Sequence, residues 1–227
     1  RLGLPPPQPY EASAWRLSEE ERLQVGLLAL VNREIELIRR GLERGVIEQR
    51  IAEILLAFAG HLFDLTRASG AAGYQEAATR DHRITEGYRT ALWLHRQFGL
   101  EGPLSEQIAT RYLVMLLKGR VIGQLREFAV RQLPPLIGPD AMSTVLRLID
   151  DRSNAAQATL DAMEKQYTGY TTKVRELLVA RLSLALEEAE YRAQRQEGLI
   201  SEDIFDDLEA DRLGRVKALS RRPPLDL

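Results

Sequence analysis

Apolar residues recur at steps of three and four positions along most of this 227-residue chain. Between residues 18 and 42 they include Leu23, Leu27, Leu30, Val31, Ile35, Ile38 and Leu42, and between 51 and 65 they include Ile51, Ile54, Leu55, Phe58, Leu62 and Leu65. This spacing places apolar side chains along one face of a helix with 3.6 residues per turn. Since no segment alternates convincingly at a period of two, the pattern predicts an all-α helical bundle.

Glycine, proline and capping residues divide this pattern into about six to seven helices. Ser18 with Glu21 forms a capping-box sequence, and Ser201 can cap the last helix. Gly198 suits a helix C-terminus, whereas Gly119 and Gly123 are expected to kink the helix that contains them. The expected helices cover about 18–42, 51–68, 80–98, 105–133, 140–166, 172–197 and 201–220, and the segment 69–73 (SGAAG) is expected to break the second.

Two segments, 45–55 and 198–208, share one local pattern. Each follows a long amphipathic helix with a glycine, an aliphatic residue at the turn and then a new apolar stripe. These are the ingredients of a helical hairpin. Ordinary helix-turn-helix chemistry explains the match more simply than a repeat does, because two copies are too few for a solenoid.

Proline marks both ends of the predicted helical domain. Residues 1–17 are proline-rich and extended, residues 18–220 form the helical domain, and residues 221–227 (RRPPLDL) form an exit linker. The segment 134–139, which holds three prolines and a glycine, is a candidate subdivision of the domain. The chain opens on Arg1 without an initiator methionine, and we expect it to belong to a longer polypeptide.

Composition excludes several functional classes. The chain has 31 basic and 33 acidic residues, so it lacks the positive field that attracts nucleic acid. Cysteine is absent, which rules out disulfides and thiolate zinc sites and fits a reducing compartment. The longest strongly apolar run, 112–117, ends at Lys118, far short of the roughly 20 residues that span a bilayer.

No catalytic constellation is recognisable. The only imidazoles are His61, His82 and His95, and none has a partner at the spacing of a known metal motif. Helical di-metal enzymes need a Glu-x-x-His pair, which is missing, and phosphate-binding glycine loops are missing as well. We therefore expect a non-enzymatic protein without metal or cofactor, although stoichiometric metal binding would reopen the question of an enzyme.

One candidate contact surface lies around the Gly-x-x-x-Gly spacing of Gly119 and Gly123. Leu116 and Leu117 precede it, and the small residues allow a close approach of another helix. The flanking basic residues exclude a lipid-facing role. The four residues are therefore predicted to serve tight packing inside the bundle or a dimer contact.

Arg39, Arg40 and Arg44 form a candidate basic cluster near the first turn between helices. It could meet anionic lipid headgroups or an acidic partner surface. The simpler interpretation is a solvent-facing cluster, since exposed charges contribute little to stability.

Four short pieces, in order, carry a family resemblance. Residues 1–4 (RLGL), 167–170 (YTGY), 198–201 (GLIS) and 222–227 (RPPLDL) resemble the cytoplasmic tail of bacterial cation/proton antiporters, relatives of the plant plasma-membrane exchangers of the salt-tolerance type. The first piece resembles the exit from the last transmembrane helix. The last two resemble the helix turn and linker that precede a cyclic-nucleotide-binding-like domain in many of these proteins.

The resemblance implies a regulatory and dimerisation domain that couples a sodium- or potassium-linked transport domain to a sensory domain. Its partners would be the transmembrane domain of the same polypeptide, a second copy in a homodimer and the downstream sensory domain. Its location would be the cytoplasmic side of the inner membrane. The alternative is a free-standing helical adaptor or ligand-binding bundle in the cytoplasm.

Overall fold

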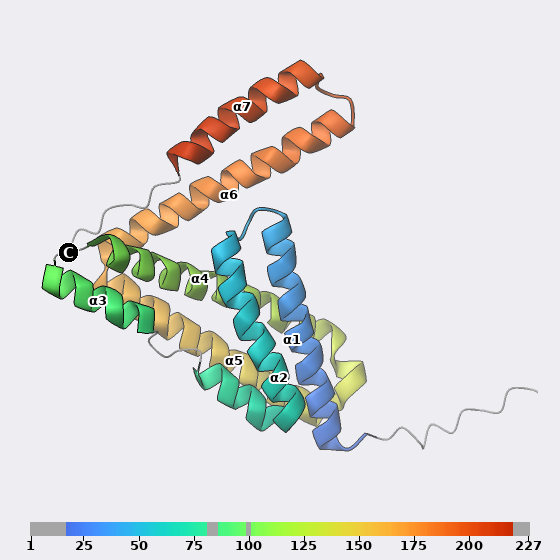
Figure 1. Ribbon diagram of the computed structural model, residues 1–227. Helices are drawn as coiled ribbons and strands as arrows, with labels where there is room; N and C mark the ends of the chain where they lie inside the picture. Colours follow the sequence, from blue (N-terminus) through green and yellow to red (C-terminus); the bar gives the residue numbers. More distant parts are fainter. Residues whose placement is uncertain (1–16, 81–85, 99–100, 220–227) are drawn as a thin grey trace, which may run out of the picture.

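A computed structural model describes residues 17–80, 86–98 and 101–219 (Figure 1). Every regular element within these ranges is a helix, which confirms the predicted all-α bundle. The predicted linkers lie outside the described residues except for Leu17, as does His82. The helices are α1 (Glu19–Glu43), α2 (Gln49–Arg80), α3 (Glu86–Phe98), α4 (Glu101–Gln132), α5 (Pro134–Gln166), α6 (Thr168–Gln196) and α7 (Glu202–Ala218).

The caps predicted for the first and last helices are confirmed. The Ser18 side chain accepts a hydrogen bond from the Glu21 amide at 3.2 Å, and the Ser18 amide donates to the Glu21 carboxylate at 2.7 Å. Ser201 accepts from the Ile204 amide at 3.4 Å. Each bond satisfies an amide that the first turn of a helix cannot pair internally.

Two helical hairpins close with the same turn, as predicted. Gly45 between α1 and α2 has φ +67°, and Gly198 between α6 and α7 has φ +72°. The residue after each glycine donates to a carbonyl five positions earlier, at 2.9 Å in the first turn and 2.8 Å in the second. This Schellman arrangement requires a left-handed residue, which glycine adopts without steric cost.

Glycine coincides with non-helical dihedrals in α2 and α5, as the sequence suggested, but not in α4. α2 departs from helical dihedrals at Ser69 and Gly70 but continues to Arg80, and α5 departs at Gly138. The kink predicted at Gly119 and Gly123 is wrong, since α4 has no non-helical residue. Glycine permits a kink without requiring one, and the residues around these two are largely buried.

The core lies between α1, α2, α4 and α5. α1 packs most extensively on α2 and α5, and α4 packs on α5. The segment 134–139 lies at the start of α5, with non-helical dihedrals at Gly138, and a subdivision of the domain there stays a prediction. α3 packs on α4. The largest fully buried side chains include Leu27, Leu30, Ile38, Leu62, Ile108, Ile122 and Leu125. In the described part of the chain, no helix is both long and apolar enough to cross a membrane.

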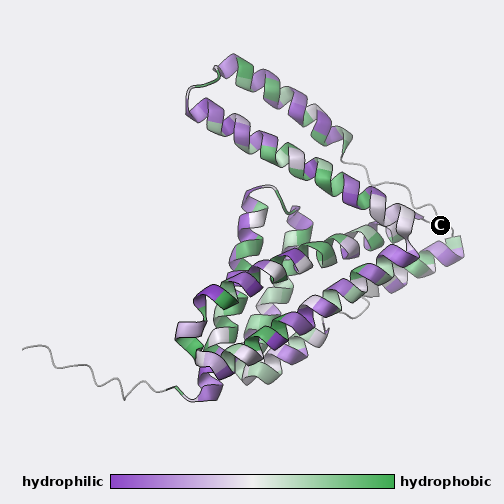
Figure 2. Ribbon diagram, turned by 180° about the vertical axis from the view of Figure 1, so that it is seen from behind, coloured by the Kyte–Doolittle hydropathy of each residue, from purple (hydrophilic) through white to green (hydrophobic). Residues whose placement is uncertain are grey.

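The α6–α7 hairpin extends away from this bundle (Figure 1). α6 contacts α4 and α5, whereas the main contacts of α7 are with α6. Seen from behind, both helices of the hairpin carry hydrophobic positions among hydrophilic ones along their whole length (Figure 2). Several of these apolar residues are exposed, among them Val179, Leu186 and Ile204, so the hairpin carries apolar surface that the bundle does not cover.

Candidate functional site

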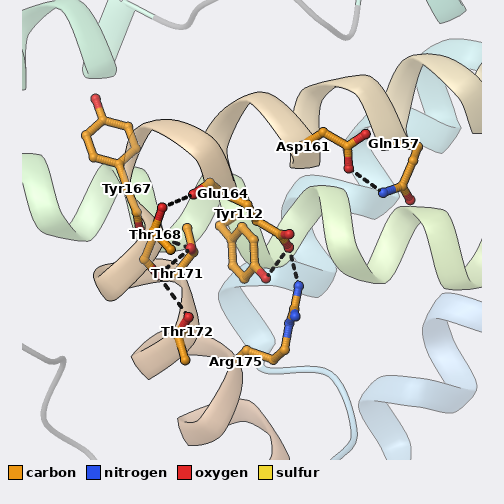
Figure 3. A network of polar contacts seen from close by, with 9 residues as sticks. All are labelled: Tyr112, Gln157, Asp161, Glu164, Tyr167, Thr168, Thr171, Thr172 and Arg175. Atoms are coloured by element: carbon orange, nitrogen blue, oxygen red, sulfur yellow. Dashed lines mark hydrogen bonds and ion pairs between the residues drawn. The ribbon is translucent and has the colours of Figure 1, made fainter.

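The junction between α5 and α6 anchors the hairpin to the bundle (Figure 3). Tyr167 interrupts the helical backbone there, with φ −129° and ψ 45°. Tyr170 is buried, and its hydroxyl donates to the Ser105 carbonyl of α4 at 2.7 Å. The two tyrosines of the 167–170 motif thus have separate positions, one at the break between the helices and one as an anchor to α4.

Glu164 completes this junction (Figure 3). It accepts a hydrogen bond from the Tyr112 hydroxyl of α4 at 2.9 Å and forms an ion pair with Arg175 of α6. Burial, followed by the bond to Glu164, raises the pKa of the Tyr112 hydroxyl. The root of the hairpin is therefore tied to two helices of the bundle.

Ion pairs join the two helices of the hairpin. Arg212 contacts Glu188 at 3.0 Å and forms two hydrogen bonds with Glu209, and Arg215 contacts Glu187 at 2.5 Å. Arg215 reaches both carboxylate oxygens of Glu187 across the two helices, whereas the two bonds of the nearly buried Arg212 to Glu209 lie within α7 and fix the arginine in place. These ion pairs hold α6 and α7 together as one unit.

A second face of α6 carries an exposed apolar stripe. Its members are Val179, Leu182, Leu186, Ala189 and Ala193, at steps of three and four residues. Val179 is 56% exposed and Leu186 is 67% exposed, while both alanines are exposed and Leu182 is half-buried. This heptad-like spacing is typical of helices that pack against another helix, and the bundle leaves the face uncovered.

The residues predicted around Gly119 and Gly123 have different environments. Leu117 is buried and Leu116 is half-buried in the bundle. A Cβ added at either glycine would meet no atom within 4 Å. These glycines therefore do not serve tight packing inside the bundle, and a dimer contact there stays a prediction.

Arg39, Arg40 and Arg44 lie exposed near the C-terminal end of α1. Arg40 forms an ion pair with Glu36 one turn earlier. Exposed i,i+4 pairs of this kind contribute only ~0.3–0.5 kcal/mol to the stability of a protein, so the fold depends little on this contact. A role toward a membrane surface or an acidic partner stays a prediction.

The search of the sequence for chemistry missed a buried ionic cluster in the core. Glu34 of α1 and Arg152 of α5 form a two-bond pair at 2.7 and 2.9 Å, and both side chains are 3% exposed. Arg152 also donates to the Tyr74 hydroxyl of α2 at 2.7 Å. The ammonium of Lys118, on α4, lies 4.2 Å from the centre of the Phe58 ring. Four helices thus contribute to one polar centre.

Burial and charge shift the proton affinities in this cluster. Burial, reinforced by the charge of Arg152 and opposed by that of Glu34, lowers the pKa of Lys118 to about 7. Burial would also lower the pKa of Arg152, but the charge of Glu34 and the Tyr74 hydroxyl outweigh it and raise that pKa. The cluster therefore holds one ion pair and one further amine that can change protonation near neutral pH.

A signal for this cluster was present in the periodicity. Glu34 lies four positions from both Leu30 and Ile38, within an apolar stripe. Arg152 lies four positions from both Leu148 and Ala156 in the same way. A charged residue on an apolar face indicates a buried partner, because an isolated buried charge is prohibitively costly.

A cavity of about 490 Å³ lies at the hairpin root, between the α1–α2 turn, α4, α6 and α7. Its polar lining residues are Glu48, Arg181, Glu188 and Arg212, and the remaining residues are apolar apart from Gly45. Such a volume and lining are typical of small-molecule sites.

Neither of the two histidines in the described ranges belongs to a group of side chains that could hold a metal ion. His61 is exposed and His95 is half-buried. Within residues 17–80, 86–98 and 101–219, no group of three histidine, aspartate or glutamate side chains could hold a metal ion. Comparison with known proteins found no matching family model, no similar curated protein and no similar solved structure.

Proposed function

We propose that this chain is a regulatory and dimerisation domain of a membrane cation/proton antiporter, and that α6 forms the dimer contact. The observation that carries the proposal is the exposed apolar stripe from Val179 to Ala193. Two copies of α6 packed along this stripe would bury Leu186 at the centre of a two-fold interface.

The ends of the stripe suit a close crossing of helices. Ala189 and Ala193 are small, so two backbones can approach near the tip of the hairpin, while Val179 and Leu186 supply apolar area nearer the root. The stripe covers only about two heptads, which is short for an independent coiled coil. The ion pairs between α6 and α7 and the hydrogen bond from Tyr170 to α4 hold α6 in place. They reduce the conformational entropy that α6 would lose when two copies associate.

The antiporter assignment rests on the four ordered sequence pieces. Two of these pieces, 167–170 and 198–201, correspond to the root and the tip of the hairpin. The hairpin is fixed to the bundle at its root and would contact a second copy along its stripe. A change in the angle between the two subunits would therefore be transmitted to the elements that flank the domain. Regulation then requires that a ligand or partner bind the two orientations with different affinity.

Light scattering after size-exclusion chromatography tests the dimer. The wild-type chain should have twice the monomer mass of 25.7 kDa, and Leu186→Glu should weaken the dimer roughly a hundredfold or more, since a symmetric interface loses the buried leucine twice. Leu136→Glu, at a similarly exposed leucine of α5, is the matched control and should remain dimeric. A monomeric wild type, or equal effects of both variants, would refute the α6 interface.

Transport by the intact antiporter tests the regulatory role. Deleting residues 168–219 should change the pH or ligand dependence of ion exchange in membrane vesicles. Unchanged transport together with unchanged dimerisation after the deletion would contradict the proposal.

The free-standing ligand-binding bundle is the second candidate, because the cavity at the hairpin root favours a ligand. The coding sequence upstream of Arg1 distinguishes the two. About twenty apolar residues close to that point would support the antiporter, and a start codon there would support the free-standing bundle.

A further inference from the structure

The cavity at the hairpin root joins two parts of the molecule. Val46 and Ile51 line it from the α1–α2 hairpin, and Leu113 and Leu117 line it from α4. The opposite wall comes from α6 and α7, including Leu178. A molecule in this cavity would touch both the bundle and the projecting hairpin.

The lining is apolar over most of its surface. Ten of its residues are aliphatic: Val46, Ile51, Leu113, Leu117, Val174, Leu177, Leu178, Leu184, Ala185 and Val216. None of the lining residues that the structure describes is a histidine or an aspartate, and the four charged ones among them belong to ion pairs. An elongated hydrocarbon chain matches this surface better than a sugar, nucleotide or peptide, whose polar groups would remain without partners.

Of the two arginines in the lining, Arg181 is the one that can accept a new anion. Arg212 is committed to Glu188 and Glu209 and is nearly buried. Arg181 donates to the Glu48 carboxylate at 2.7 Å and to the Leu219 carbonyl at 2.9 Å. The Glu48 side chain is 42% exposed, so it can return to water at small cost when another carboxylate replaces it.

We infer that this cavity binds one long-chain carboxylic acid, with the carboxylate on Arg181 and the hydrocarbon chain among the leucines of α4 and α6. The bound chain would fill space between the bundle and the hairpin and hold the hairpin at one angle. The inference rests on the cavity alone, because a monomer contains the whole site. A monomeric wild type in the light-scattering experiment would therefore not contradict this inference.

Binding is measured with cis-parinaric acid, a fluorescent fatty acid, added to the wild-type chain below its micelle concentration. Saturable binding of one molecule per chain is expected. Displacement by decanoate, dodecanoate and tetradecanoate should strengthen by roughly fourfold per added methylene until the cavity is full. Adsorption to an open surface would show no such limit in chain length.

Two pairs of variants locate the site. Val216→Trp fills the cavity from α7 and should weaken binding more than tenfold, whereas Leu213→Trp, outside the lining on the same helix, should not. Arg181→Gln should weaken dodecanoate by about tenfold and leave dodecanol unchanged. Arg195→Gln, at an arginine of α6 whose ion pair with Glu202 lies outside the lining, should change neither ligand.

Three results would contradict binding in this cavity. Absence of saturable binding by wild type, binding only to phospholipid vesicles, or equal affinity of Val216→Trp and Leu213→Trp would overturn the inference. A thermal melt verifies that each variant is folded. If Val216→Trp does not fold, the ratio of acid to alcohol affinity in Arg181→Gln decides the matter, and an unchanged ratio refutes the role of Arg181.

Discussion

Replacing Lys118 with methionine should stabilise the protein, and the gain should depend on pH. Lys118 lies 2% exposed in the core beside the Glu34–Arg152 pair. Burial lowers the pKa of the Lys118 ammonium most, and the charge of Arg152 lowers it further against the opposing charge of Glu34. Methionine has a similar length and no charge, and it keeps contact with Phe58.

The magnitude follows from the proton affinity. The pKa of Lys118 falls from 10.5 to about 7 through burial and the charge of Arg152. At about 1.4 kcal/mol per pH unit this difference corresponds to ~5 kcal/mol of cost for the charged form. The contact of the ammonium with Phe58 at 4.2 Å returns up to ~2 kcal/mol, so a gain of ~3–5 kcal/mol at pH 6 is expected.

The stability of the wild type should rise with pH because the folded pKa of Lys118 is lowered. A lysine whose folded pKa is raised by an acidic partner behaves in the opposite way. Below pH 7 Lys118 is charged in the folded and unfolded states, and the full cost applies. Between pH 7 and about 10.5 the unfolded chain binds more protons, so the wild type gains stability as pH rises. The advantage of Lys118→Met should therefore shrink steadily from pH 7 toward pH 10.

Urea unfolding followed by circular dichroism at pH 6, 8 and 9.5 measures both effects. Lys165→Met, at an exposed lysine of α5, is the matched control and should change the unfolding free energy by less than ~0.5 kcal/mol at every pH. A destabilised Lys118→Met variant, or a gain equal at pH 6 and pH 9.5, would refute the reasoning.

Three further substitutions test other contacts. Arg152→Leu leaves Glu34 buried without its cation and should lower the unfolding free energy by ~3–5 kcal/mol in urea titrations; a loss below 1 kcal/mol would contradict full desolvation of the pair. Gly119→Ala should raise the stability of the monomer by up to ~1 kcal/mol, because the added Cβ meets no atom within 4 Å. Gly198→Ala adds the same methyl group at φ +72° and should instead cost ~1–2 kcal/mol. Each glycine variant is the control for the other in thermal melts. Melting temperatures that shift in the same direction in both variants would contradict the effect expected from their backbone conformations.

Features that depend on neighbours a few residues away could be predicted from the sequence. The bonds between Ser18 and Glu21 span three positions, and the turns at Gly45 and Gly198 span five. Such bonds form whenever the local chain adopts one conformation, so residue type and spacing suffice. The kink expected at Gly119 and Gly123 was wrong because a permissive residue does not impose a bend, and α4 keeps helical dihedrals throughout.

The sequence by itself determined that the chain forms about seven helices, how the first and last of them begin, and which residues share a helical face. Only the tertiary structure decided which faces are covered and which distant charges meet. Glu34 and Arg152 are separated by 118 positions and form one buried pair. The stripes of α1 and α6 have the same three-and-four spacing, yet the first is largely buried and the second is largely exposed. Periodicity defines a face within one helix, whereas burial depends on where the other helices pack, and that is a property of the whole chain.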